Sequence, residues 1–339
     1  QNADEGTRKT INQFLNYPEN SAGSLMTIEY VDLHDYFTVR KAMDYIRRTG
    51  IDKETVYTCY VIDDQRRLVG QVSLRKLIIA PESACIRDIM DTNIVSAATT
   101  DDQEAVADDF RRYDLTSIAV CDKEGRLVGI ITIDDIVDVI QDENTEDIKK
   151  MAAIIPSDED YMKTSVWSLV AHRLPWLMLL MISATFTSTI ITHFETLLSG
   201  AVLLTAFIPM LMDSAGNSGS QTSVTVIRNL ALGEIELRDW PHVLAKEIGV
   251  AIVSGAALAL VNFLRIILFT STSMMIAAVV SVTLFCTVII AMIVGCLLPI
   301  GAKKLGFDPA VMASPMITTI VDACSLMIYF LIATSMLGL

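Results

Sequence analysis

The sequence predicts an α+β soluble region of two βαββα repeats, joined by an acidic linker helix to an all-α transmembrane domain of five helices. Residues 1–165 hold 32 Asp and Glu against 19 Lys and Arg, a net charge of about −13, whereas residues 166–339 hold 8 against 7. The second half also contains apolar runs of the length that spans a bilayer. In the first half, a block recurs with a spacing of 59 residues, which indicates an internal repeat.

The repeat becomes visible when Gly70 is placed over Gly129. Residues 57–78 and 115–137 then both show a strand, a polar turn, Arg-Leu-Val-Gly, a second strand and a helix start. A helix-like run precedes each block (39–49 and 102–113), and so does an expected strand with a Met at its head (24–27 and 88–91). We therefore expect a residual N-terminal helix or linker at 1–20, a first unit at 21–84 and a second at 85–141.

These repeats resemble a CBS-domain pair, in which two such units pack into one disk. Such pairs often bind adenine nucleotides, and a Ser/Thr-x-x-Asp motif after the second strand holds the ribose. The second copy keeps this motif as Thr132 to Asp135, whereas the first copy reads Ser73-Leu-Arg-Lys76. The resemblance implies ATP as a candidate ligand of Thr132 and Asp135. The alternative is a capped helix start that binds no ligand.

The soluble half ends in an acidic run, with Asp134, Asp135 and Asp138 followed by Asp142, Glu143, Glu146 and Asp147. Like charges three or four residues apart destabilise a helix, and hard cations such as Mg²⁺ would remove that repulsion because carboxylates are their ligands. We interpret residues 142–172 as a linker helix that binds cations; a solvated acidic helix is the alternative. A chain of net charge −14 without a basic stripe is not expected to bind nucleic acid.

Five apolar segments, at about 174–193, 197–230, 244–269, 274–301 and 309–337, place residues 173–339 in the lipid bilayer. If the N-terminal half is cytoplasmic, the basic residues of the loops fall on one side, and only Arg265 falls on the other. The positive-inside bias thus places the acidic domain in the cytoplasm, and we expect a multi-pass protein of the plasma (inner) membrane. An odd number of spans would put the C-terminus outside.

The second and fifth segments carry polar residues at membrane depth. The second is about 34 residues long, too long for one straight span, and its middle contains Pro209, Asp213, Asn217 and Gln221. Such residues are tolerated where they line a cavity, although small residues alone also serve helix packing. In the fifth segment, we interpret Asp308 as the N-cap of a helix that has Pro309 at its first position.

Asp322 lies in the fifth segment about 21 Å further along that helix and about 40° around it from Asp308. An ionised carboxylate at this depth is costly unless it faces water, a cation or a bundle interior. We interpret this stripe as a cation path with one acid at its mouth and one deep inside. A protonated Asp322 bonded within the bundle is the alternative.

These features together resemble the MgtE family of magnesium channels. The resemblance rests on the CBS pair, the acidic helix with Thr145-Glu-Asp-Ile, the run from Asp213 to Gln221, Arg228-Asn-Leu-Ala-Leu-Gly-Glu, and the pattern from Asp308-Pro-Ala to Thr-Thr-Ile-Val-Asp322. Family members usually carry a further N-terminal helical domain, of which only a tail at 10–20 is expected here.

The resemblance implies a homodimer in the membrane lipid, with a pore on the two-fold axis. It places a hydrated Mg²⁺ at Asp322 with Asn217 and Ser314 nearby, and Asp213 and Gln221 are the further pore candidates. Intracellular Mg²⁺ would close the channel by binding a set of regulatory acids: Glu104, Asp114, Asp135, Asp138, Glu143, Glu146, Asp147 and Asp308.

The expected function is therefore Mg²⁺-selective uptake across the plasma membrane through a channel that internal Mg²⁺ closes. A divalent-cation secondary transporter coupled to H⁺ or Na⁺ is the alternative, because Asp322 could carry a proton. An isolated sensor without transport would not need Asp322. The four histidines stand alone, without the His-Glu-x-x-His of an intramembrane metalloprotease, so no enzyme is expected.

Overall fold

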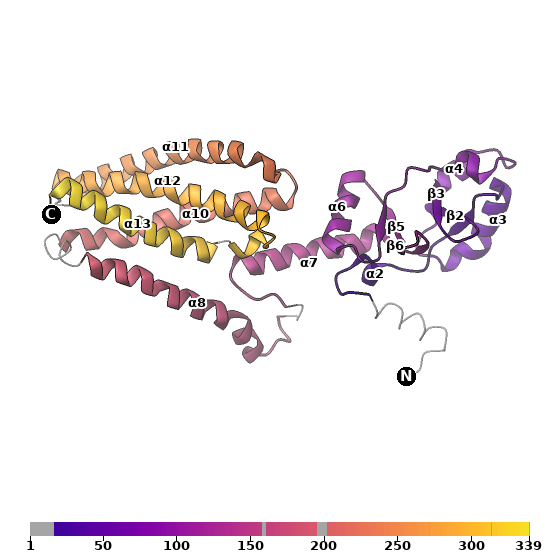
Figure 1. Cartoon of the computed structure of the whole chain (residues 1–339), viewed down its shortest axis with the longest axis horizontal. Coiled ribbons are helices and arrows are strands. Elements are labelled where there is room, and N and C mark those ends of the chain that lie inside the picture. Colours follow the sequence, from indigo (N-terminus) through magenta and orange to yellow (C-terminus); the bar gives the residue numbers. More distant parts are fainter. Residues whose placement is uncertain (1–16, 158–160, 195–201, 271, 313, 339) are drawn as a thin grey trace. The chain divides into compact units, whose positions relative to one another are not determined.

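The computed structural model describes residues 17–157, 161–194, 202–270, 272–312 and 314–338 (Figure 1). The chain forms two compact units, Gln1–Asn144 and Thr145–Leu339. Most of the segment expected at 1–20 lies outside the described residues. The first unit is mixed α and β, and the second is helical, as the sequence predicts.

The first unit contains the predicted repeat as two sheets with one topology. In the first, β1 (Asp32–His34) runs parallel to β2 (Thr58–Ile62), which runs antiparallel to β3 (Leu68–Ser73). In the second, β4 (Ser96–Ala98), β5 (Ser117–Cys121) and β6 (Leu127–Thr132) repeat this order. Gly70 pairs with Val61 and Gly129 with Val120, so the aligned glycines occupy equivalent places. The predicted alignment is confirmed.

The two segments headed by Met26 and Met90 are not the strands that the sequence predicts. They form the short helices α2 (Ala22–Leu25) and α5 (Ile86–Ile89), each with the Met in extended conformation at its end. Each Met then lies against the other repeat: a Cβ on Gly129 would lie 2.6 Å from Met26 Sδ, and one on Gly70 2.5 Å from Met90 Sδ. The two repeats thus exchange side chains across their interface, a contact that sequence periodicity does not encode.

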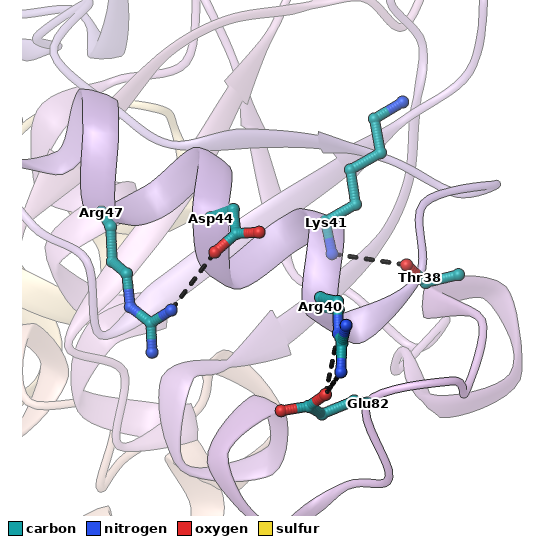
Figure 2. Close-up of polar contacts among 6 residues, drawn as sticks. All are labelled: Thr38, Arg40, Lys41, Asp44, Arg47 and Glu82. Carbon is teal, nitrogen blue, oxygen red and sulfur yellow. Dashed lines mark hydrogen bonds and ion pairs between the residues drawn. The ribbon is translucent and has the colours of Figure 1, made fainter.

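Helix α3 (Val39–Thr49) shows how the soluble helices begin and pack (Figure 2). Thr38 Oγ1 accepts a hydrogen bond from the Lys41 backbone N–H at 3.3 Å, which satisfies one of the free donors of the first turn. The ion pairs of α3 with Glu82 and within the helix are exposed and add little stability. Its buried side, through Val39, Ala42 and Ile46, holds it on the sheet.

The helices α4 (Leu74–Ile79) and α6 (Gln103–Tyr113) complete the repeats, and α7 (Ile133–Met151) leaves the second one. The linker predicted as one helix at 142–172 is wrong in its extent. Helix α7 already begins at Ile133, and it ends at Met151; α8 begins only at Val166, where Ser165 caps it. Ala153 adopts a positive φ of 54° and Pro156 follows, and both oppose a continuous helix.

Within the described residues of the second unit, four helices are long and apolar enough to cross a membrane. They are α8 (Val166–His193), α11 (Trp240–Phe269), α12 (Met274–Lys304) and α13 (Ser314–Leu337). Helix α10 (Ile208–Ala231) has the length of a span but carries polar residues in its middle. Five spans therefore remain a prediction.

Helix α10 covers only part of the apolar segment at 197–230, which the sequence shows to be too long for one straight span. A 3-10 turn, η2 (Val202–Phe207), precedes it, residues 195–201 lie outside the described part, and α10 itself has 24 residues. Pro209 stands in its first turn, where a missing N–H costs nothing. The stretch from Asp213 to Gln221 stays helical, because its backbone groups are satisfied within the helix.

Helix α10 packs against α12 and α13, and α11 packs on the other side of α12 (Figure 1). The closest approach joins two glycines: a Cβ on Gly295 of α12 would lie 2.3 Å from the Gly219 carbonyl oxygen of α10. Small residues permit such backbone contact between helices in lipid. This crossing determines how near α10 lies to its neighbours.

We predict that Gly295→Ala destabilises the membrane unit, because the new methyl group would have to push a backbone aside. Overpacking of this kind costs about 2 kcal/mol, which corresponds to roughly 5 °C in the melting temperature of a chain of this size. Thermal unfolding of the detergent-purified protein measures it. Gly301→Ala on the same helix is the control, since a Cβ there meets nothing within 4 Å. Equal melting temperatures of the two variants would contradict the assignment.

Candidate cation site

Asp322 lies half-buried on α13, on the side that faces α10. Its neighbour across the gap is Gly216: a Cβ there would lie 3.2 Å from Thr318 Cγ2 and 4.0 Å from Asp322 Oδ1. The missing side chain lets the carboxylate approach the backbone of α10. A glycine in this place thus makes room for the acid.

Helix α10 presents the other predicted polar residues next to this point. Asp213, Asn217 and Gln221 are four residues apart, so they share one face of the helix, and each is exposed in the single chain. The charge of Asp213 acts on Asp322. Two neighbouring carboxylates repel each other unless a cation or a proton lies between them. The arrangement is therefore suited to attracting cations at membrane depth.

Ser314, the remaining predicted pore residue, is the first residue of α13. Its side chain lies outside the part that the structure describes. Its place near Asp322 therefore stays a prediction.

Asp308, the predicted acid at the mouth, opens the 3-10 turn η4 (Pro309–Met312). Its Oδ1 accepts a hydrogen bond from the Ala310 backbone N–H at 2.8 Å, as the cap interpretation predicts. Its Oδ2 accepts one from Lys150 Nζ at 2.7 Å, and the same ammonium lies 2.6 Å from Glu146 Oε1. Two acids predicted to bind a divalent cation thus share a lysine.

The sequence reasoning missed Lys150, although its spacing of four residues from Glu146 was a signal for an ion pair within a helix. Burial by itself lowers the pKa of the Lys150 ammonium. The hydrogen bonds to Asp308 and Glu146, together with their charges, outweigh burial and raise that pKa above its usual value. Lys150 is therefore a permanent cation at this mouth.

The other predicted regulatory acids are spread over the surface of the second repeat and α7. Glu104 lies in the first turn of α6, and Asp114 caps its C-terminus with a left-handed φ of 51°. Asp135, Asp138 and Asp147 lie on α7, as does Glu143, which accepts a hydrogen bond from Gln103 Nε2 at 2.7 Å. Across the described ranges, no three His, Cys, Asp or Glu side chains come together as a metal site.

The contacts of Thr132 and Asp135 give no indication of a nucleotide site. Thr132 is 5% exposed, and its hydroxyl donates to Asp135 Oδ2 at 3.0 Å, at the point where α7 begins. This contact agrees with the interpretation of a stabilised helix start. A cavity of about 700 Å³ lies elsewhere in the soluble unit, lined mainly by the first repeat, with Thr116 from the second. Its lining residues are Tyr57, Thr58, Ser73, Leu74, Arg75, Ile78, Ile79 and Thr116.

Comparison with known proteins gives a family match for both halves of the chain. Residues 22–83 and 86–142 match the model of the CBS domain, and residues 208–332 match the MgtE model, described as a divalent cation transporter. The magnesium transporter MgtE of Thermus thermophilus is 37% identical over 334 residues, which cover 98% of this chain and 74% of that protein. The Bacillus subtilis MgtE is 36% identical over 328 residues, with 96% and 72% covered.

Among solved structures, the soluble part of a magnesium transporter is 39% identical over the matched region. That region covers 42% of this chain and 55% of the other, with a TM-score of 0.41. The cytosolic domain of the Mg²⁺ channel MgtE in complex with ATP is 43% identical, covers 40% and 55%, and has a TM-score of 0.40.

A CBS pair joined to apolar helices that carry intramembrane acids defines a membrane transport protein with a soluble CBS region. The relatives that match nearly the whole chain are transporters, and this protein is not an enzyme. The chain belongs to the MgtE family.

Proposed function

We propose that the chain is a Mg²⁺-selective channel that mediates magnesium uptake across the plasma membrane as a homodimer. The observation that carries this proposal is the Asp322 carboxylate beside Asp213, against the bare backbone at Gly216. In this proposal the CBS pair is cytoplasmic and the C-terminus is outside, in keeping with the bias of the basic residues.

The pore would form where two copies meet on a two-fold axis. The polar face of α10 is exposed in the single chain, and lipid offers no hydrogen bonds to Asp213, Asn217 and Gln221. A second copy would enclose that face as a water-filled path. Mg²⁺ gives up its hydration shell reluctantly, so carboxylates that bind it through water suit a conducting site. Asp322 from each copy would hold the hydrated ion, with Asn217 and Ser314 around it.

We predict that Asp322→Ala lowers Mg²⁺ flux into proteoliposomes by about tenfold or more, because the path then lacks the charge that attracts the ion. A fluorescent Mg²⁺ indicator inside the vesicles measures the initial rate. Glu234→Ala, which removes an exposed acid beyond the end of α10, serves as the control and should keep the flux. Retained flux in Asp322→Ala would rule out this site.

A carrier coupled to H⁺ or Na⁺ is the second candidate, and the half-buried Asp322 favours it, since an acid at membrane depth can carry a proton. Currents whose reversal potential follows the Mg²⁺ gradient alone support the channel. A reversal potential that shifts with the H⁺ or Na⁺ gradient supports the carrier instead.

For gating, we propose that intracellular Mg²⁺ closes the channel by binding the acids of the second repeat, of α7 and of the mouth. The excess negative charge of the soluble half supports this, because two such regions in a dimer repel each other when no cation is bound. Differential Mg²⁺ affinity between the closed and open states supplies the energy. The proposed regulatory acids are Glu104, Asp114, Asp135, Asp138, Glu143, Glu146, Asp147 and Asp308.

We predict that a variant with Asn in place of Asp114, Asp138 and Asp308 stays open at internal Mg²⁺ concentrations that close the wild type. Each change removes a ligand charge for the ion, so closure should need about tenfold more Mg²⁺ or more. Patch recordings at graded internal Mg²⁺ measure it. Asp64→Asn, an exposed acid outside the set, is the control; closure like the wild type in the triple variant would refute this mechanism.

For a nucleotide, we propose that ATP binds in the cavity lined mainly by the first repeat rather than at Thr132 and Asp135. The cavity combines an aromatic ring at Tyr57, apolar side chains at Ile78 and Ile79, and the guanidinium of Arg75. An aromatic ring can stack on a base, and a guanidinium suits a phosphate. Lys76 stands where a ribose-binding Asp is expected, so phosphate contacts would dominate.

We predict that Tyr57→Ala weakens ATP binding about tenfold, which is the usual loss when a stacking ring is removed. Titration calorimetry of the full chain measures the dissociation constant. Tyr57 is 75% exposed, so its removal should leave the fold intact. Thr132→Ala should bind ATP as tightly as the wild type does. If Thr132→Ala weakens ATP binding and Tyr57→Ala does not, the ATP site lies at Thr132 and Asp135 instead.

A further inference from the structure

Lys150 joins the end of α7 to the mouth of the membrane unit. Its Nζ lies 2.6 Å from Glu146 Oε1 on α7 and 2.7 Å from Asp308 Oδ2 at η4. The lysine side chain is 25% exposed and each carboxylate side chain 37%. The three charges are thus partly shielded from water, where they interact more strongly than at an open surface.

Packing on both sides holds this contact in place. The next residue, Met151, packs against Ile227 of α10 and Ala310 of η4, both of which are buried. Asp308 is tied down as well, since its second oxygen accepts the Ala310 N–H at 2.8 Å. An apolar contact and an ionic contact therefore dock the last turn of α7 side by side.

The charges of Glu146, Asp308 and Lys150 do not cancel. Two carboxylates and one ammonium leave a net charge of −1, so the group still attracts cations. A divalent cation between the same two carboxylates would neutralise them fully, and carboxylate oxygens are its preferred ligands. The ammonium and a divalent ion cannot occupy that place together, so the ion can enter only by exchange.

We propose that Lys150 is a built-in cation that holds the end of α7 at the mouth, and that a divalent cation enters between Glu146 and Asp308 by displacing it. The inference rests on the proposed role of Asp308 in Mg²⁺ gating. Mg²⁺ must compete with the Lys150 ammonium for this acid pair. The competition weakens the apparent affinity of the pair for Mg²⁺. The mouth then responds to higher Mg²⁺ concentrations than two bare carboxylates would.

Hydrogen exchange of the full chain in detergent tests the docking, with peptides that cover the last turn of α7 and the Ala310 amide. Without divalent ions, Lys150→Gln should exchange about fivefold faster than the wild type in both places, as expected when a partly shielded ion pair is lost. Lys149→Gln is the matched control, because Lys149 Nζ bonds the Ser157 carbonyl oxygen instead of Asp308. Lys150→Arg keeps the charge and should retain the slow exchange.

Mg²⁺ titration of the same peptides tests the displacement. In Lys150→Gln, Mg²⁺ should slow the exchange back to the wild-type rate, because the ion replaces the missing ammonium. Wild-type exchange in Lys150→Gln without divalent ions, or equal losses in the Arg and Gln variants, would overturn the docking role. Fast exchange of Lys150→Gln at saturating Mg²⁺ would overturn the displacement. These readouts do not depend on flux, so a failure of the transport proposal remains distinguishable.

Discussion

The position of Asp322 against α10 depends on close contact between helices at places where glycine leaves out the side chain. Gly219 and Gly295 bring the backbones of α10 and α12 together, and Gly216 lets Asp322 reach α10. In lipid, such contact replaces the hydrophobic driving force that packs helices in water. A bulkier side chain at these glycines would move α10 away from α12 and from Asp322.

This contact also explains why the acids are tolerated. A lone carboxylate in hydrocarbon is expensive, but a carboxylate next to polar side chains and an accessible face can be hydrated or bind an ion. The exposed Asp213, Asn217 and Gln221 provide that face on α10. These residues make the single chain unsuited to lipid, and in the proposed dimer they would line a path for a hydrated cation.

The two ends of helix α7 belong to different cores. Ile136 and Val139 are buried with the second repeat, whereas Met151 packs with residues of the membrane unit. Residues of both units thus belong to α7, and Lys150 provides a cation of the chain's own at the end that contacts Asp308.

The sequence by itself determined the two repeats, the apolar helices and the identity of the intramembrane acids, because repetition, hydropathy and isolated charges are local properties. Tertiary structure alone decided that Met26 and Met90 cross to the opposite repeat, that α7 ends at Met151, and that Lys150 lies between Glu146 and Asp308. The physical reason is distance along the chain. Lys150 and Asp308 are 158 residues apart, and a pattern that repeats over a few residues cannot report a contact that only folding brings together.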